Sequence, residues 1–325
     1  MQTTISIAIL RYPDCAMSAV YGLYEMFLTA NRYTQPMPLS YFSQQANAQA
    51  QSVAHFVPNI VDYVDQERDL SSLQSHVLIV PPALGEYYLS PNKKLLHWLK
   101  IFRESNADSI IAAACAGVFL LAEADLLLGR KCTTHWDLAE QFKQRFPDIV
   151  LDSDKILVEQ GDLLTAGGMM SWIDLGLELV KKFTSEQVMR QLGKMLVVDT
   201  ASREQRSYQQ FQPNLRHQDQ AILTVQAYIA DHLNSALKVK QLADLAHMHE
   251  RSLLRRFSKA TGLKPTQYIQ RARIQRACDL LESTQLTFER IAYQVGYQDV
   301  SACRKLFNAT MGVSPKVFRQ RFVMK

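Results

Sequence analysis

The sequence has no apolar run near the length of about 18–20 residues that a membrane-spanning helix requires. Its first ten residues carry no basic stretch and read at once as a strand, so we expect no signal peptide. It has few cysteines, an odd number without the spacing of a disulfide framework: Cys15, Cys115, Cys132, Cys278 and Cys303. These absences exclude a membrane-spanning protein and a disulfide-rich secreted domain, and predict a cytoplasmic protein with reduced thiols.

Charged residues are also somewhat sparse, at 21%, and they are unevenly distributed. Residues 219–325 hold 17 Lys and Arg against 8 Asp and Glu, a net charge of +9. The other residues hold 19 against 23, a net charge of −4. A basic third on an acidic body is typical of a nucleic-acid-binding module, although a solvated basic surface explains the same numbers. A chain of 325 residues also exceeds the size of a single core, which predicts at least two domains.

Short apolar segments alternate with helical patterns through residues 1–197. The strand-like segments are 5–10, 39–43, 76–82, 109–114, 155–160 and 163–168, and the helical patterns are 17–31, 92–104, 117–127, 136–146, 170–182 and 185–197. This alternation predicts a largely parallel α/β sheet with helices on both faces. The polar segment 198–219 reads as a linker or extended arm, with Tyr208 and Phe211 packed on a neighbour.

Residues 220–325 read as purely helical and contain an internal repeat with a displacement of 50 residues. The repeated positions are Phe257, Gly262, Pro265 and Arg271, which recur as Phe307, Gly312, Pro315 and Arg321. Each copy predicts a short helix, a tight turn and a second helix, at about 238–259 and 287–309. We expect Gly296 to supply a positive φ in the second turn, and Gly262 and Gly312 to end helices. The sequence therefore predicts an all-α domain with two helix-turn-helix units.

The segments RARIQRACDLL and IAYQVGYQDVSACRKLFNATMGVSPKVFRQRF make the region 221–323 resemble the DNA-binding domain of the AraC family of transcription regulators. The resemblance implies that two reading helices enter consecutive major grooves of double-stranded DNA. It places base contacts at Arg251, Leu254, Arg255, Ser301, Arg304 and Lys305. Arg255 and Lys305 are the strongest candidates because a cation donates to guanine, whereas His249 and Asp299 are expected to be helix caps first and readers second. A helical protein-interaction bundle is the alternative.

The stretch IAAACAGVF carries an apolar segment into Cys115, which lies between small residues and before a helix. This pattern is typical of a nucleophile elbow, in which the helix N-terminus lowers the pKa of the thiol. His135, with Asp137 two residues later, is a candidate base and orienting carboxylate. An inert buried thiol is the commoner role of such a cysteine, and Thr133 or Thr134 with Asp137 explains the second stretch equally well as helix capping.

Three segments, 12–31, 113–136 and 163–180, resemble the flavodoxin-like, class I amidotransferase-like domain of the PfpI/ThiJ superfamily. They are most similar to the GlxA-like regulators, in which this domain is fused to an AraC-type domain. The resemblance implies an effector-sensing domain at 1–197, a linker at 198–219 and a DNA-binding domain at 220–325. Catalytic relatives carry an acidic residue on the first helix where this chain has Ala19. We therefore predict a degenerate catalytic site and no enzyme activity.

The resemblance implies a small-molecule effector, an amino acid or quaternary amine, bound at the carboxyl ends of the strands. The expected lining is Tyr12, Pro13, Cys115, Ala116, His135, Trp136 and Gly168. Tyr12 and Trp136 offer cation–π surface, or else they pack in the core. The other expected partners are a second copy in a homodimer and RNA polymerase, with no metal and no cofactor. A thiol-dependent hydrolase or glyoxalase-like enzyme using Cys115, and a regulator with Cys115 as a redox sensor, stay open as alternatives.

Overall fold

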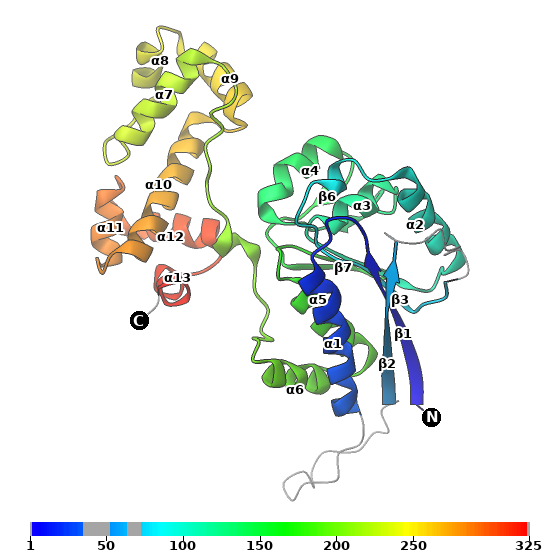
Figure 1. Cartoon of the computed structure of the whole chain (residues 1–325). Helices are drawn as coiled ribbons and strands as arrows, with labels where there is room; N and C mark the ends of the chain where they lie inside the picture. The colour runs from blue at the N-terminus through cyan, green and yellow to red at the C-terminus, as the bar shows by residue number, and fades with distance from the viewer. Residues whose placement is uncertain (1, 35–52, 64–72, 324–325) are drawn as a thin grey trace, which may run out of the picture. The chain divides into compact units, whose positions relative to one another are not determined.

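The computed structural model describes residues 2–34, 53–63 and 73–323. The chain divides into two compact units, Met1–Gln205 and Arg206–Lys325. The first alternates strands and helices, and the regular elements of the second are all helices among its described residues (Figure 1). This composition confirms the predicted sequence of an α/β sheet followed by an all-α region. In the part of the chain that the structure describes, no helix is both long and apolar enough to cross a membrane.

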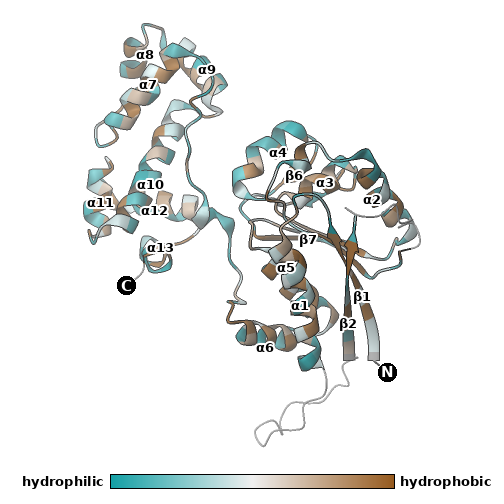
Figure 2. Cartoon of the chain, viewed as in Figure 1, coloured by the Kyte–Doolittle hydropathy of each residue, from teal (hydrophilic) through white to brown (hydrophobic). Residues whose placement is uncertain are grey.

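The first unit is built on a six-stranded sheet in the order β2-β1-β3-β4-β8-β7. These strands are β1 (Gln2–Arg11), β2 (Val53–Asp62), β3 (Val77–Val80), β4 (Ile110–Ala114), β7 (Leu157–Gln160) and β8 (Leu163–Ala166). Every neighbouring pair is parallel except the β7–β8 hairpin, so the predicted, largely parallel sheet is confirmed. Strands β3 and β4 are buried along their whole length, which fits their continuous apolar sequence. Figure 2 shows the hydrophobic colour along much of the neighbouring strand β1, whose apolar residues belong to the same core.

Six helices cover the sheet in two groups. They are α1 (Met17–Thr34), α2 (Lys93–Ser105), α3 (Gly117–Glu123), α4 (Ala139–Arg145), α5 (Trp172–Phe183) and α6 (Glu186–Leu196). Helices α1, α5 and α6 pack together, and α2 packs with α3. Because right-handed crossovers lead from β1 toward one edge and from β3 and β4 toward the other, the two groups lie on opposite faces. The structure also has three short 3-10 helices among its described residues: η2 (Tyr87–Leu89), η3 (Trp136–Leu138) and η4 (Gln205–Tyr208).

Strand β2 was not predicted from the sequence. It contains Pro58, which pairs in register with Ile7 of β1, and among the described residues no strand pairs with its other side. Proline is tolerated at an edge because no second neighbour needs its missing N–H group, so the breaker signal misled the prediction. The two-residue strands β5 (Lys131–Cys132) and β6 (Val150–Leu151) were also missed. The strand expected at 39–43 lies outside the described residues.

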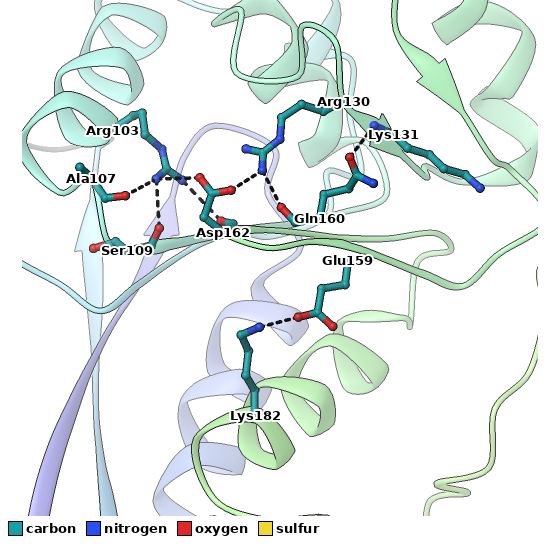
Figure 3. A network of polar contacts seen from close by, with 9 residues as sticks. All are labelled: Arg103, Ala107, Ser109, Arg130, Lys131, Glu159, Gln160, Asp162 and Lys182. Atoms are coloured by element: carbon teal, nitrogen blue, oxygen red, sulfur yellow. Dashed lines mark hydrogen bonds and ion pairs between the residues drawn. The ribbon is translucent and has the colours of Figure 1, made fainter.

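A polar network fastens the β7–β8 hairpin at the end of the sheet opposite Cys115 (Figure 3). Asp162 follows the turn of the hairpin and pairs with Arg103, at 3.1 Å, and with Arg130. Its backbone oxygen accepts a hydrogen bond of 2.8 Å from the N–H of Ile111 in β4. The Arg130 guanidinium lowers the pKa of the Asp162 carboxyl. The pair therefore stabilises the folded unit at neutral pH, and this contribution is lost as the pH falls through that lowered pKa.

The second unit contains seven helices in its described residues. They are α7 (Gln220–Asp231), α8 (Val239–Leu245), α9 (Glu250–Thr261), α10 (Pro265–Ser283), α11 (Phe288–Gln294), α12 (Val300–Met311) and α13 (Pro315–Phe322). One hydrophobic core forms around Leu253 and Phe257, and another forms around Phe307 and Phe318. The long helix α10 contributes residues to both cores, so it joins the two halves of the repeat.

The segment 198–219 is divided by the boundary between the units. On the first side, Arg203 forms a bidentate ion pair with Asp174 of α5. On the second side, the ring of Tyr208 packs edge-on against Phe322 at 5.4 Å, and Phe211 packs against Tyr268 at 5.1 Å. The packing expected of Tyr208 and Phe211 is therefore observed. The unit boundary falls between Gln205 and Arg206, within the segment that the sequence assigned to a linker.

Candidate DNA-binding helices and cysteine elbow

The two helix-turn-helix units have matching turns. Met248 N–H donates to the Ala243 oxygen at 3.0 Å in the first unit, and Tyr297 N–H donates to the Ala292 oxygen at 2.9 Å in the second. Both alanines are buried, which confirms that small residues occupy the positions where the helices approach closely. Gly296 has the predicted positive φ, of 88°. In the first turn the left-handed backbone occurs at His247, which is exposed and has a φ of 51°. The sequence did not reveal this position.

The predicted reading positions all lie on exposed faces of α9 and α12. In α9, the buried Leu253 and Phe257 face the core, and the residues between and before them face solvent. The exposed candidates are His249, Arg251, Leu254, Arg255, Ser301, Arg304 and Lys305. Glycines at the predicted positions end both helices, with φ of 73° at Gly262 and 70° at Gly312. The arrangement can present two short rows of side chains to a groove, and base contact itself stays a prediction.

The helix starts are capped in different ways. The carboxylate of Asp299 accepts from Ser301 N–H at 2.8 Å and from Ala302 N–H at 3.2 Å, so the cap expected there is confirmed. His249 occupies the N-cap position before α9, but its side chain makes no capping hydrogen bond. The imidazole of His249 is therefore available at the exposed end of the first reading helix, whereas Asp299 is occupied by its own helix.

The cations on the two helices differ in their partners. Arg304 pairs with Glu289 at 2.8 Å and its guanidinium lies 5.5 Å from the centre of the Phe288 ring. Within the described residues, no ion pair holds Arg255 or Lys305. The sequence did not single out Arg256, which forms a bidentate ion pair with Asp219 and so fixes α9 to the start of α7. Arg255 and Lys305 therefore share with Arg251 an exposed position and no ion pair among the described residues, whereas Arg304 is paired.

The cysteine elbow, residues 114–117, has the predicted backbone geometry. Cys115 follows directly after β4 and has a φ of 54°, the left-handed conformation of a strained strand-to-helix turn. Its N–H donates to the Ala166 oxygen at 2.8 Å. A Cβ atom at Gly117 would lie 2.4 Å from the Pro81 oxygen and 2.8 Å from the Val80 oxygen. The elbow therefore needs small residues because the end of β3 passes directly beside it.

The electrostatics of the elbow contradict the activated nucleophile and agree with the alternative, an inert buried thiol. Cys115 is 2% exposed, and burial raises the pKa of its thiol to about 11, with only a partial lowering by the N–H of Ala116. The expected activation by the helix N-terminus is therefore wrong, because loss of hydration outweighs the favourable amide. At neutral pH the group is a protonated, weakly nucleophilic thiol.

His135 is not arranged as the base of a catalytic triad. Its Nδ1 accepts a hydrogen bond of 3.1 Å from Asp137 N–H, so the histidine caps η3 itself, and burial lowers its pKa. Of the hydrogen bonds between described side chains, none joins His135 to Cys115. The two threonines expected as possible caps point elsewhere: Thr133 donates to the Lys155 oxygen at 2.8 Å, and Thr134 donates to the Cys115 oxygen at 2.7 Å.

The residues expected to line an effector pocket meet at one edge of the sheet. Tyr12 and Pro13 follow β1, Cys115 and Ala116 follow β4, and Gly168, with a φ of 96°, follows β8. The Thr134–Cys115 hydrogen bond brings the loop of His135 and Trp136 to the same edge. Trp136 is half-buried there, whereas Ala116 is buried.

Two aromatic residues at this edge, Tyr87 and Tyr88, were not predicted from the sequence. Tyr12 is buried and its hydroxyl donates to the Pro81 oxygen at 2.6 Å, while Tyr87 lies 6.0 Å from it, centre to centre. Tyr88 packs on Phe119 of α3 at 4.8 Å. The signal available in the sequence was an aromatic pair shortly after the strand-like segment 76–82. Ala19, which stands where an acidic residue was expected in catalytic relatives, is buried. Glu25, later on the same helix, is exposed, so its carboxylate does not enter the core.

We expect Cys115 to resist alkylation in the native chain. A thiol whose pKa is about 11 carries about a hundredfold less thiolate at neutral pH than an ordinary cysteine, and this one is also shielded from solvent. Iodoacetamide labelling at neutral pH, followed by peptide mass spectrometry with and without urea, measures the effect. Labelling of native Cys115 as fast as in urea would contradict the buried, protonated state and favour the nucleophile or redox alternatives.

Comparisons with known proteins agree with the two halves of the chain. A family model described as the DJ-1/PfpI family matches residues 59–182, and one described as a helix-turn-helix domain matches residues 242–321. The HTH-type transcriptional regulator CdhR of Pseudomonas aeruginosa is 24% identical over 264 residues, which is 81% of this chain and 77% of that protein. The HTH-type transcriptional regulator GbdR of the same species is 23% identical over 211 residues, which is 65% of this chain and 57% of GbdR.

Among solved structures, that of Drosophila melanogaster DJ-1beta is 16% identical, with a TM-score of 0.43, and covers 61% of this chain and 100% of its own. The matched regulators carry names of DNA-binding proteins, and their similarity extends across both units of this chain. The chain therefore combines a domain that matches the DJ-1/PfpI family with a domain that matches the helix-turn-helix model, and it is similar across both to HTH-type transcriptional regulators.

Proposed function

We propose that this transcriptional regulator reads two neighbouring major-groove sites through α9 and α12, under the control of a small metabolite. The observation that carries the proposal is the pair of matched helix-turn-helix units, each with an exposed row of polar and cationic side chains above a buried phenylalanine. Residues 219–325, which contain both helix-turn-helix units, carry a net charge of +9, which favours a polyanionic partner. Full-length chain should bind duplex DNA with an affinity that falls steeply with salt concentration. Absence of binding at low salt would overturn the proposal.

The proposed effector site is the carboxyl edge of the sheet, where Tyr12, Cys115, His135 and Trp136 meet. A sensor role fits this edge better than catalysis, because the thiol is protonated and His135 is occupied as a cap. The aromatic residues favour an amino acid or a quaternary amine, which binds to ring faces by cation–π attraction. Thermal-shift measurements on the full chain with amino acids, betaines and polyamines test this class. We further propose that the regulator acts as a homodimer and engages RNA polymerase.

Arg255→Ala should weaken specific DNA binding by about 1–3 kcal/mol and relax the base preference at one position of the site. The reason is that Arg255 is exposed on α9, and no ion pair within the described residues competes for its guanidinium. Binding to a selected site and to its single-base variants measures the change. Arg256→Ala is the matched control, since Arg256 pairs with Asp219. A loss that is equal on every sequence, random DNA included, would mean that Arg255 touches only phosphate.

A further inference from the structure

Gln205 is a buried polar residue at the point where the chain passes from one unit to the other. It is the last residue of the first unit and the first of η4, whose remaining residues belong to the second unit. Its side chain is 3% exposed, although both its sequence neighbours are half-buried. A glutamine in a polar segment is normally solvated, so its burial requires specific partners.

The amide of Gln205 makes four polar contacts, one at Oε1 and three that share the two hydrogens of Nε2. Its Oε1 accepts from Trp136 N–H at 3.1 Å. Its Nε2 faces the Thr134 oxygen at 2.9 Å, the Lys155 oxygen at 2.9 Å and the Thr133 hydroxyl at 3.2 Å. The backbone N–H of Gln205 also donates to the Asp154 oxygen, at 2.8 Å. The side chain therefore binds the backbone on both sides of His135, at the Thr134 oxygen and at the Trp136 N–H.

The space for this amide depends on Gly167, at the end of β8. A Cβ atom at Gly167 would lie 1.9 Å from Gln205 Nε2 and 2.6 Å from the Thr134 oxygen. Thr134 in turn donates from its hydroxyl to the Cys115 oxygen at 2.7 Å. One buried amide thus connects the cysteine elbow, the Trp136 backbone and the end of β8.

The residues that follow Gln205 are fastened to the second helix-turn-helix unit. Arg206 donates from Nη1 to the Ala309 oxygen of α12 at 3.2 Å. The hydroxyl of Ser207, which is buried, accepts from Arg321 Nη1 at 2.8 Å. Tyr208 packs against Phe322 of α13. In the sequence, the residue bound at the elbow edge is followed directly by the residues bound to α12 and α13.

We infer that Gln205 is the positioning residue that couples the effector edge to the DNA-reading helix α12. This inference rests on the proposed function. A ligand that shifts the Trp136 backbone changes the hydrogen bonds of Gln205, and through the next residues it changes how α12 is held. Coupling of this kind is reciprocal, so DNA bound at α12 must alter the Trp136 loop in return. The reciprocal effect can be measured before the effector is identified.

The test is hydrogen–deuterium exchange of the full chain, with and without saturating sonicated genomic DNA at low salt. In the natural sequence, DNA binding should change the exchange of the peptide that contains the Trp136 amide. In Gln205→Leu, that amide should exchange roughly tenfold faster without DNA, because its acceptor is lost, and should no longer respond to DNA. Gln212→Leu makes the same chemical change at an exposed position of the same segment and should behave as the natural sequence.

Gly167→Ala provides an independent route, since its methyl group displaces the Gln205 amide while leaving the glutamine in the chain. It should reproduce the Gln205→Leu result, and exchange of the β4 amides shows that both variants are folded. A Trp136 amide that still responds to DNA in either folded variant would overturn the inference. So would DNA binding by the natural chain with no change at Trp136, whereas failure to bind DNA at all would overturn the proposed function instead.

Discussion

Phe257→Ala and Phe307→Ala should each remove about 3–5 kcal/mol of stability from one helix-turn-helix unit while leaving the other folded. Both rings are completely buried, and each is central to a different core. Phe257 packs edge-on against Tyr268 at 5.2 Å, whereas Phe307 packs edge-on against Phe288 at 5.8 Å and Phe318 at 5.6 Å. Truncation of either ring to a methyl group leaves a cavity under the reading helix, and the lost packing and the cavity together destabilise the unit.

Hydrogen exchange of the α9 and α12 peptides separates the two effects. Phe257→Ala should accelerate exchange in α9 and spare α12, and Phe307→Ala should do the reverse. Leu254→Ala, at a position 40% exposed on α9, is the control and should change stability by less than about 0.5 kcal/mol. Melting of both helices in either phenylalanine variant would show that α10 makes the two cores a single cooperative unit, contrary to the expectation.

The repeat was predictable from the sequence because its signals are local and occur twice. Phe257 and Phe307 recur at the same displacement as the glycines that end the helices, so the core positions and the helix ends were fixed together. The strand β2 was not predictable in this way, because Pro58 is tolerated only at the edge of a sheet. Whether a strand lies at an edge depends on the order of strands, which is a property of the whole fold.

The elbow shows where local reading ends. The small residues around Cys115 correctly predicted the backbone geometry, since they are demanded by the adjacent turn and strand. The sequence left open whether the thiol of Cys115 is activated or inert, because its pKa is set mainly by burial beneath side chains that come from distant segments. Gln205 was missed for the same reason. Its segment is polar in composition, and only the partners brought by the fold make its burial favourable.

Gly296→Ala should destabilise the second helix-turn-helix unit by about 2–5 kcal/mol. Two costs combine. The φ of Gly296 is 88°, which an alanine adopts only with strain. A Cβ atom there would also lie 2.3 Å from the Leu233 oxygen and 2.8 Å from Arg273 Nη2. Those two groups are hydrogen-bonded to each other through Arg273 Nε at 2.9 Å, so the methyl group would disrupt the contact between α10 and the loop after α7.

His247 gives the matched comparison, because it occupies the equivalent position in the first turn with a φ of 51°. It is exposed, and the following residues of both turns make the same backbone hydrogen bond, so the left-handed backbone alone does not require glycine. His247→Gly should therefore change stability by less than about 1 kcal/mol, since relief of backbone strain offsets the added freedom of the unfolded chain. Urea unfolding and DNA binding of the two variants measure the difference. If Gly296→Ala changed stability as little as His247→Gly does, the second turn would be able to move away from Leu233 and to hold an alanine at this φ. That result would contradict the expected cost.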